Sequence, residues 1–471
     1  MTTPYIGLVG LGTMGASLAR NAARNGATVA VYNRTTEKTD AFVTAHGSEG
    51  KFLPCKTIAD LLQTLPQPRA IILMVNAGKP VDDVITELLT TTHYPLTTDD
   101  ILIDAGNSHF SDTERREKML SEKNIHFIGM GVSGGEQGAL LGPSMMLGGK
   151  TEAYERLRPL LSKMAAKDGS GGKCIALIGS GGSGHFVKMV HNGIEYGDMQ
   201  LIAESYALLK NVLGLENAQI ADTFESWNKK RELKSFLIEI TAQIFRKRDD
   251  LGSGDLIDAI KDEAKQKGTG KWTTQSALDL GVSIPTMTAA VDARFMSSLK
   301  SLRVAAAATL GTLDTKNVKL SVNQVRDALL LSKICSYAQG LAMIAVASAE
   351  HSWSIDLAET CRVWKGGCII RSTLLRTFEQ AFAEQRDLKN LLLYPAITEQ
   401  FRKRHQKWRK VVSSGALAGI PLPAMSASLA YFDVLRSAQL PQNLTQAQRD
   451  FFGAHTFERT DLEGVFHANW Q

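Results

Sequence analysis

The chain has 471 residues, a length that exceeds one ordinary domain and predicts two or three. Hydrophobic residues make up 44% and charged residues 21%, which is typical of a soluble globular protein. The net charge of +5, from 53 basic and 48 acidic side chains, is too small and too dispersed to indicate a nucleic-acid partner, although it is compatible with a small anionic substrate.

The cysteines and the N-terminus indicate the compartment. Five cysteines are an odd number, lie far apart and form no Cys-x-x-Cys pair, so we expect neither a disulfide framework nor a metal site. The first residues lead directly into a strand-like run, without the basic region and apolar core of a secretory signal. No uninterrupted apolar run approaches the roughly 18 residues of a membrane span. We therefore expect a cytoplasmic protein with no membrane partner.

The first motif is a glycine-rich turn between a strand and a helix. Residues 5–9 form a short apolar strand, the pattern Gly-x-Gly-x-x-Gly follows at once, and an amphipathic helix over 14–25 leads to a second strand over 28–32. This order is the fingerprint of a dinucleotide-binding site, in which the phosphates lie on the helix N-terminus, and we prefer it to a purely structural turn. The residues expected to contact the cofactor there are Gly10, Leu11, Gly12, Thr13, Met14 and Gly15.

The end of the second strand indicates which dinucleotide binds. NAD sites usually carry an acidic residue there, but this chain has Asn33, Arg34 and Thr35. An arginine fork attracts the 2′-phosphate of NADP, and the two neighbours can donate further hydrogen bonds. We therefore predict NADP as the cofactor, with a surface arginine of no special role as the alternative.

Further apolar strands are expected over 70–75, 101–104, 125–129 and 174–178, each followed by a small polar loop. In a parallel sheet these loops share one crevice at the carboxyl ends of the strands. The loop residues expected in this crevice are Val75, Asn76, Ala77, Asn107, Ser133, Gly134 and Gly135. Asn107 and the serine–glycine loop can hydrogen-bond a polyhydroxy substrate, although ordinary turn chemistry explains them equally well.

The stretch from 184 to 196 is the predicted catalytic segment. As a helix it places Lys188, His191, Asn192 and Glu195 on one side, because the steps of three, four and seven residues recur on one helical face. Lys188 and Glu195 then lie about 10 Å apart along the axis. One can accept a proton and the other can give one. An exposed helical face is the alternative.

Strand signals fade after residue 180, which predicts three parts: a Rossmann-like domain over 1–180, an all-helical domain over 181–435 and a tail over 436–471. In the helical part we expect helices over 198–213, 220–228, 237–245, 286–307, 324–350 and 388–415. The residues from Ile220 to Leu237 match those from Leu357 to Leu374 at a constant offset, which favours an internal duplication over chance similarity.

Two further segments carry chemistry. The loop over 266–272 is basic and bounded by glycines, which suits a phosphate, although a solvated lysine loop is an equal alternative. The terminal tail carries Arg449 and His455 beside two phenylalanines, so we expect it to dock on another surface.

Together these residues closely resemble the decarboxylating 6-phosphogluconate dehydrogenases over essentially the whole chain. The motifs that carry the resemblance are Gly-Leu-Gly-Thr-Met-Gly, Asn-Arg-Thr, Gly-Asn-Ser, Val-Ser-Gly-Gly, Lys-Met-Val-His-Asn-Gly-Ile-Glu-Tyr, Lys-Gly-Thr-Gly-Lys-Trp-Thr, Gly-Gly-Cys-Ile-Ile-Arg-Ser and Gln-Arg-Asp-Phe-Phe-Gly-Ala-His-Thr. The resemblance implies oxidative decarboxylation of 6-phosphogluconate to ribulose 5-phosphate, with NADP as the oxidant.

The resemblance also implies roles for individual residues. Lys188 is the base on the 3-hydroxyl and then polarises the 3-keto group, while Glu195 protonates C1 of the enediol. Residues implied to hold the sugar acid are Asn107, Ser133, Gly134, Gly135, His191 and Asn192. Those implied to hold its phosphate are Tyr196, Lys267, Thr269 and Arg294, with Arg449 and His455 from the tail of the partner subunit in a homodimer.

The chain departs from the family pattern at three positions: Asn76 where lysine is usual, Gln137 where glutamate is common, and Leu147 where proline is common. Two alternatives stay open from the sequence. One is another β-hydroxyacid dehydrogenase, such as one acting on 3-hydroxyisobutyrate, although these are shorter and lack the tail. The other is a non-catalytic NADP sensor, which predicts loss of Lys188 or Glu195, and both are present.

Overall fold

The computed structural model describes residues 5–230, 232–266, 268–311 and 318–470. Its N-terminal part is a layered α/β domain around one eight-stranded sheet of order β3-β2-β1-β4-β5-β6-β7-β8. Because β1 pairs with both β2 and β4, the strand order reverses beside β1, which is where such sheets bind their ligands. The strands are β1 (Tyr5–Val9), β2 (Thr28–Tyr32), β3 (Lys51–Cys55), β4 (Ala70–Leu73), β5 (Ile101–Asp104), β6 (His126–Ser133), β7 (Ser144–Gly148) and β8 (Ile175–Gly179).

Two of these strands, β3 and β7, are not among the predicted elements, and the expectation of a parallel sheet is wrong at β7. This strand runs antiparallel to β6, because only the short helix α6 (Gly135–Leu141) separates them, and a parallel crossover needs a longer connection. The edge strand β3 is short, and Pro54 interrupts its apolar pattern.

Helices cover both faces of the sheet and bury a separate apolar core on each. The core on one face includes side chains of α1 and α7, and the core on the other includes side chains of α3, α4 and α5. Their bounds are α1 (Thr13–Arg24), α2 (Thr36–His46), α3 (Ile58–Thr64), α4 (Lys79–Thr90), α5 (Phe110–Ser121) and α7 (Thr151–Met164).

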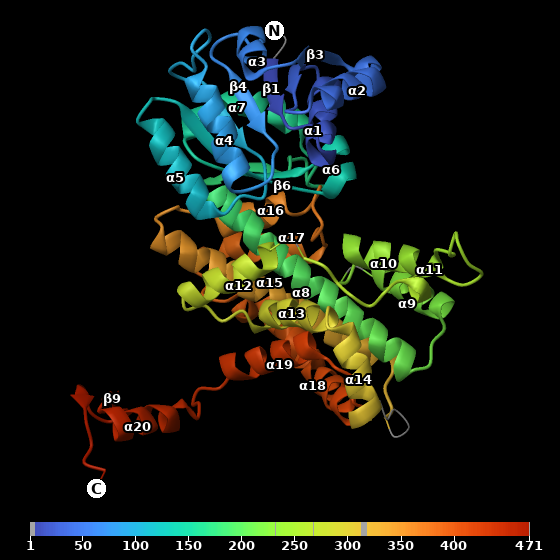
Figure 1. Ribbon diagram of the computed structural model, residues 1–471. Coiled ribbons are helices and arrows are strands. Elements are labelled where there is room, and N and C mark those ends of the chain that lie inside the picture. The colour runs from blue at the N-terminus through green and yellow to red at the C-terminus, as the bar shows by residue number, and fades with distance from the viewer. Residues whose placement is uncertain (1–4, 231, 267, 312–317, 471) are drawn as a thin grey trace.

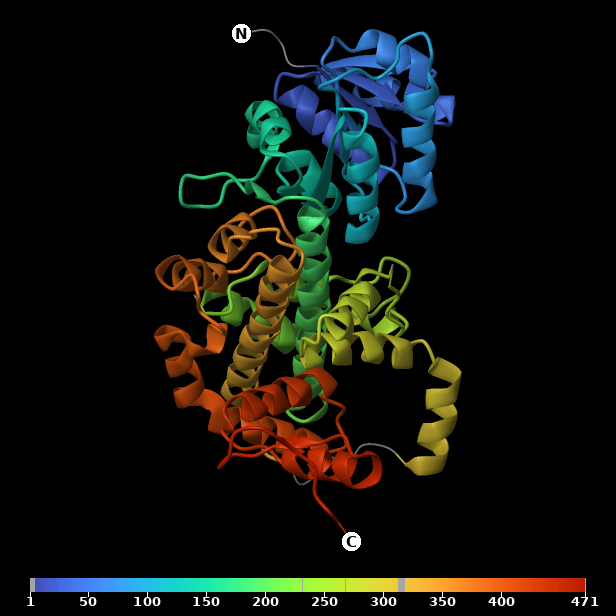
Figure 2. The ribbon, with the colours of Figure 1, turned by 90° about the vertical axis from the view of Figure 1, so that its left-hand side faces the viewer.

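The remainder is a helical domain around two long helices of 29 residues, α8 (Ser183–Asn211) and α15 (Val322–Glu350), which pack side by side. Figure 2 shows α8 leaving the sheet domain and running down the middle of the helical domain. α15 alone among the described helices is long and apolar enough to cross a membrane, but 83% of its apolar window is buried in the fold, as in a core helix. The other helices are α9 (Asn217–Lys229), α10 (Phe236–Arg246), α11 (Leu256–Ala259), α12 (Thr269–Asp279), α13 (Pro285–Ser297), α14 (Lys300–Leu310), α16 (Leu357–Val363), α17 (Leu374–Glu384), α18 (Pro395–Leu417) and α19 (Pro423–Leu435).

The two long helices each begin a similar unit. α8 is followed by the packed pair α9 and α10, and α15 is followed by the packed pair α16 and α17. Ser235 and Ser372, which match in the sequence comparison, form an antiparallel bridge, and the matching Trp227 and Trp364 are both buried. This arrangement is compatible with the predicted duplication, which stays a prediction.

Four predicted helical segments have clearly different bounds in the structure. The segments 184–196 and 198–213 form the single helix α8. The segment 286–307 is broken at Ser298 and Leu299 into α13 and α14. The last predicted helix begins at Pro395 rather than at 388, because proline is favoured in the first turn and disfavoured further in.

The C-terminal tail extends away from the helical domain (Figure 1). It consists of α20 (Gln442–Gly453), β9 (Phe457–Glu458) and β10 (Val465–Phe466). The buried carboxylate of Asp450 accepts hydrogen bonds from Thr456 N, Ala468 N and Trp470 Nε1. The tail is therefore folded upon itself.

Candidate active site

Helix α8 meets the end of the sheet at unusually short range, and glycines make this possible. A Cβ on Gly184 would lie 2.5 Å from the carbonyl oxygens of Gly129 and Met146. A Cβ on Gly131, in β6, would lie 2.4 Å from Cβ of Lys188. The backbone of β6 therefore packs directly on the side of α8 that carries Lys188.

Lys188 lies at the centre of a buried polar group. Its side chain is only 7% exposed, and its ammonium lies 2.8 Å from Asn192 Oδ1 and 3.4 Å from His191 Nδ1. His191 in turn lies 3.1 Å from Ser133 Oγ through Nε2, which ties α8 to the end of β6. The structure thus brings together four of the predicted site residues.

Glu195 lies beyond this group on the same helix. Its Oε2 is 3.9 Å from Nδ1 of His191, and the carboxylate is about a quarter exposed. The next residue, Tyr196, is buried and stacks its ring against the guanidinium of Arg294, 3.5 Å from the ring centre. The predicted catalytic pair and two predicted phosphate ligands are therefore neighbours.

Burial changes the protonation of these groups. It lowers the pKa of Lys188 from its usual value, which the charge of Glu195 partly offsets. Burial raises the pKa of Glu195, against the opposing effects of Lys188 and Arg294. His191 has a pKa held well below its usual value, mainly by burial and then by Lys188, so it is neutral. The site can therefore hold a lysine that loses its proton and a carboxyl that keeps one.

The glycine loop has the form that a dinucleotide requires. Gly10 has a left-handed φ of 98°, and a Cβ there would lie 2.4 Å from Met74 O. Gly12 faces open space and caps α1 without a side-chain hydrogen bond, which leaves the first amides of the helix available to a phosphate. Thr13 is exposed at this helix end.

Asn33, which is predicted to donate to the cofactor, makes two hydrogen bonds within the fold. Its Oδ1 accepts from Leu11 N at 3.0 Å, and its Nδ2 donates to Thr35 O at 3.1 Å. This side chain thus holds the glycine loop in place. Arg34, beside it, is exposed and makes no hydrogen bond or ion pair within the described part of the chain, so its guanidinium is free to bind a ligand.

The loops after β4 and β5 lie against the glycine loop and against each other. A Cβ on Gly10 would also lie 3.1 Å from Cγ1 of Val75, and a Cβ on Gly106 would lie 3.0 Å from Val75 O. Asn76 and Asn107 are the exposed residues of these two loops. The three strand-end loops therefore share one crevice, as predicted.

A cleft joins this crevice to α8, and its lining residues are Asn107, Ser108, His185, Lys188, Met189, Asn192, Thr269 and Trp272. Four of them, Ser108, His185, Met189 and Trp272, were not predicted as site residues. Adjacency could have indicated three of them, because Ser108 follows Asn107 and His185 and Met189 flank Lys188 on α8. Trp272 lies three residues after the predicted Thr269 on α12, so its place at the end of the 266–272 loop was also a signal.

The remaining predicted residues among those that the structure describes do not line this cleft. Lys267 lies outside the described residues. Gly134 and Gly135 begin α6 beside Ser133. Arg449 and His455 belong to the tail, where both are exposed. Within one chain, the tail therefore contributes none of the cleft's lining residues.

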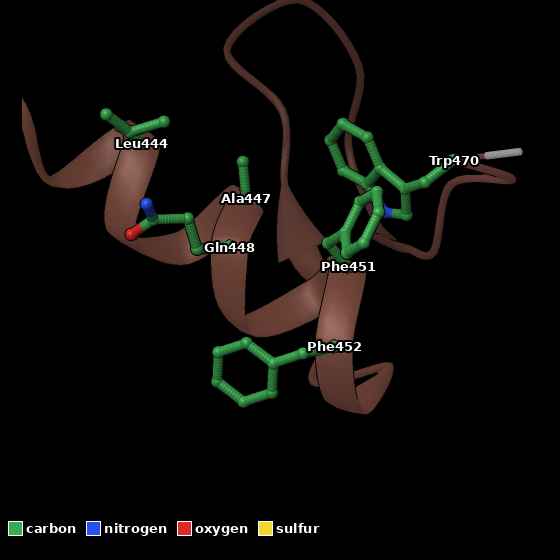
Figure 3. A pocket seen from close by; sticks show the side chains of 6 residues that line it. All are labelled: Leu444, Ala447, Gln448, Phe451, Phe452 and Trp470. Carbon is green, nitrogen blue, oxygen red and sulfur yellow. The ribbon is translucent and has the colours of Figure 1, made fainter.

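The tail also has an exposed apolar surface, shown in Figure 3, where Phe451 and Trp470 lie together beside α20. We call this surface the tail pocket, and its lining residues are Leu444, Ala447, Gln448, Phe451, Phe452 and Trp470. The rings of Phe451 and Phe452 are 62% and 73% exposed.

Comparison with known proteins agrees with this geometry. Residues 5–179 match the NAD-binding domain of 6-phosphogluconate dehydrogenase, and residues 184–470 match the C-terminal domain of the same enzyme. A relative from Synechococcus elongatus, named 6-phosphogluconate dehydrogenase, decarboxylating, is 52% identical over 100% of both chains. A relative from Bacillus subtilis, named as the NADP(+)-dependent, decarboxylating enzyme, is 49% identical over 100% of both chains.

A solved structure of the Plasmodium falciparum 6-phosphogluconate dehydrogenase is 42% identical, with a TM-score of 0.94, and the match covers 99% of this chain and 100% of the other. That enzyme is described in its apo form and in complex with NADP+ and with 6-phosphogluconate. Matches over the whole length do not fit the alternative of a shorter β-hydroxyacid dehydrogenase. The chain belongs to the 6-phosphogluconate dehydrogenase family.

Proposed function

We propose that the protein is an NADP-dependent, decarboxylating 6-phosphogluconate dehydrogenase. It oxidises 6-phospho-D-gluconate to D-ribulose 5-phosphate and CO₂ and reduces NADP to NADPH, a step of the pentose phosphate pathway. The observation that carries the proposal is the buried ammonium of Lys188, 2.8 Å from Asn192 Oδ1, in a cleft that adjoins the glycine loop and has Glu195 two helical turns further on.

The residues present fit NADP. The open amides at the start of α1 suit the pyrophosphate, and the left-handed Gly10 lets the backbone come close to it. Arg34, exposed and unpaired among the described residues, suits the 2′-phosphate. Val75 lies beside Gly10, Asn76 and Ala77 follow it in the same loop, and Asn107 lines the cleft with Lys188, where the bound cofactor would supply the hydride acceptor.

Lys188 acts first as a general base. It must be neutral to take the proton of the 3-hydroxyl, and burial lowers its pKa toward that state. Asn192 and His191 orient the amine, and Ser133 fixes His191 in turn. The protonated lysine then polarises the 3-keto group, so that the carboxylate leaves as CO₂ and the electrons are held in the enediol.

Glu195 then acts as the general acid at C1. Burial raises the pKa of its carboxyl, which favours the protonated form that this step needs. Asn107, Ser133, Gly134, Gly135, His191 and Asn192 are proposed to hold the sugar acid. Tyr196, Lys267, Thr269 and Arg294 are proposed to hold the phosphate.

The direct test is the absorbance at 340 nm after mixing the protein with 6-phosphogluconate and NADP. The proposal requires NADPH to appear with one CO₂ per turnover and with NADP used in preference to NAD. 3-Hydroxyisobutyrate, offered in a parallel reaction, should give no NADPH. Absence of turnover with 6-phosphogluconate, by a folded protein that binds NADP, would refute the proposal.

We further propose a homodimer in which each tail completes the other subunit's site. Three observations support it: the tail extends from its own domain, Arg449 and His455 are exposed and absent from the cleft wall, and the tail pocket is apolar and open. The tail would bring the guanidinium of Arg449 and the imidazole of His455 to the substrate phosphate. We accordingly divide the chain into 1–180, 181–435 and 436–471, and the five free, buried cysteines support a reducing cytoplasm.

A further inference from the structure

The sequence motifs do not account for Arg116, a fully buried arginine on α5 that lies behind the ligand-binding loops. We infer that Arg116 is a positioning residue that fixes the loop after β4 and the loop after β5 relative to each other, and so aligns the cofactor with the substrate. The inference rests on the proposed function and concerns a residue that itself touches neither ligand.

One side of the guanidinium holds the loop after β4. Nη2 of Arg116 donates to Gly78 O at 3.0 Å, and Gly78 ends the loop that carries Val75 and Asn76. Nε and Nη2 also donate to the two carboxylate oxygens of Asp82, at 2.8 and 3.2 Å, in the first turn of α4. The planar fork therefore fixes both the end of this loop and the start of the helix after it.

The other side holds the loop after β5. Nη1 lies 3.4 Å from Oδ2 of Asp104, which is also fully buried. Asp104 Oδ2 accepts from Ser108 Oγ at 2.6 Å, and Asp104 Oδ1 accepts from Gly106 N at 3.1 Å. These two contacts flank Asn107, the residue proposed to touch both substrate and cofactor.

The two loops also pack closely, since a Cβ on Gly106 would lie 3.0 Å from Val75 O. A displacement of one loop therefore moves the other. Val75 lies beside Gly10 of the glycine loop, and Asn107 and Ser108 line the cleft with Lys188. Arg116 thus links the cofactor's loops to the loop that faces the substrate, and errors in such alignment are costly to hydride transfer.

The neighbouring Arg115 provides a matched control. It also pairs with Asp82, at 3.0 Å, but from the solvent side, since its side chain is 53% exposed. Its other described partner is Asp112, and it contacts neither Asp104 nor Gly78. Loss of Arg115 therefore removes an ion pair with the same carboxylate and leaves both loops anchored.

The experiment compares Arg116→Lys, Arg116→Ala and Arg115→Ala. It measures the Kd for NADP by calorimetry, kcat and KM with 6-phosphogluconate, and the free energy of unfolding in urea. Arg116→Ala should raise the Kd for NADP and lower kcat, so that the ratio of kcat to Kd falls about ten- to hundredfold. Arg116→Lys should recover only part of this loss, because an ammonium cannot make the fork. Arg115→Ala should stay within about twofold of the unchanged protein.

Guanidinium at millimolar concentration should partly restore kcat of Arg116→Ala, because it can occupy the place of the lost side chain. Urea at the same concentration carries no charge and should not restore kcat. If neither additive changed kcat, or both changed it equally, the charged fork would not be what aligns the loops. Asp82→Ala is a second variant in case Arg116→Ala does not fold, since the side chain of Asp82 is only half-buried. It should raise the Kd for NADP more than Arg115→Ala does. Equal effects of Asp82→Ala and Arg115→Ala, or an Arg116→Ala protein with unchanged Kd and kcat, would overturn the inference. Failure of the unchanged protein to oxidise 6-phosphogluconate would instead refute the proposed function. Calorimetry distinguishes the two failures, because the Kd for NADP is measured without turnover.

Discussion

Lys188 and Asn192 lie one helical turn apart on α8, and the lysine ammonium donates a hydrogen bond of 2.8 Å to the amide oxygen Oδ1. The bond holds the amine in place at the cleft while burial lowers its pKa. An oxygen acceptor of a neutral amide does this without adding a second charge beside the base. A carboxylate at the same place would instead stabilise the protonated form.

We predict that Lys188→Met abolishes turnover and leaves the Kd for NADP nearly unchanged. The variant removes both the base and the group that polarises the keto intermediate, whereas the glycine loop is untouched. Steady-state assays and calorimetry on the same preparation test this. Lys210→Met, near the far end of the same helix and paired with Asp258, is the control and should remain active. A Lys188→Met protein with more than a few per cent of the original kcat would contradict the assignment.

The pH dependence of hydride transfer should reveal the charge of Glu195. The base must be neutral, so the rate rises with pH through the pKa of Lys188, which burial places below its usual value. The carboxylate of Glu195 raises that pKa, so Glu195→Gln should shift the rise to lower pH. Stopped-flow absorbance at 340 nm isolates this step. The same variant should slow the protonation of C1 more than hydride transfer. A rise that stays in place or moves to higher pH would show that Glu195 carries no negative charge that acts on Lys188.

Arg34 should determine the preference for NADP. Arg34→Ala removes a charge-assisted contact that contributes on the order of 1.5–3 kcal/mol, so KM for NADP should rise roughly ten- to hundredfold. KM for NAD should change much less, because NAD has no 2′-phosphate. Lys38→Ala, on the exposed side of α2, controls for a general loss of positive charge. Equal changes of KM for the two cofactors would contradict contact with the 2′-phosphate.

The sequence predicted those parts of the fold that depend on local pattern. The glycine loop and the face of α8 that carries Lys188 follow from spacing alone, and the structure agrees. The break at Ser298 and Leu299 was missed because apolar residues continue on both sides of it. In a single chain none of the side chains of α14 is buried, so the apolar pattern there does not mark a core-facing helix. Trp272 was missed although it lies three residues after the predicted Thr269, because the packing of α12 on α8 is what shows that this residue lines the cleft.

Arg116 could not have been found from its neighbours in sequence. It stands in a highly charged helix with Arg115 next to it, and nothing local distinguishes the two. Only the tertiary fold buries one and exposes the other, since Arg116 faces the loops after β4 and β5. The family resemblance likewise indicated residues that touch ligands, rather than those that hold the loops behind them.

Lys333 and Asp198 form a buried ion pair that joins the two long helices, and removing only one of the two charges should strongly destabilise the fold. Both side chains are almost completely buried, and Lys333 Nζ lies 2.6 Å from Asp198 Oδ2. Lys333→Met leaves a buried charge without its partner, which costs about 3–5 kcal/mol in the free energy of unfolding. Lys333→Met combined with Asp198→Asn should recover much of this loss. Urea denaturation measures both, with the exposed Lys79→Met as a control of small effect. Additive losses in the double variant would show that the two charges do not interact.

Tail exchange between subunits can be tested by mixing two inactive proteins, Arg449→Ala and Lys188→Ala. In a mixed dimer, one site combines the intact Lys188 of the first chain with the intact tail of the second, whereas the other site carries both substitutions. Random reassortment makes half of the dimers mixed, with one working site in two, so activity should recover to about a quarter of the unchanged protein. The measurement is NADPH formation after co-expression of equal amounts, with a different tag on each chain to confirm mixed dimers. The matched control replaces Arg449→Ala by Arg459→Ala, whose guanidinium pairs with Asp461 within the tail, and this chain should be active alone. If mixed dimers of the two inactive chains form and stay inactive, the tail does not serve the partner's site, and the exposed positions of Arg449 and His455 need another explanation.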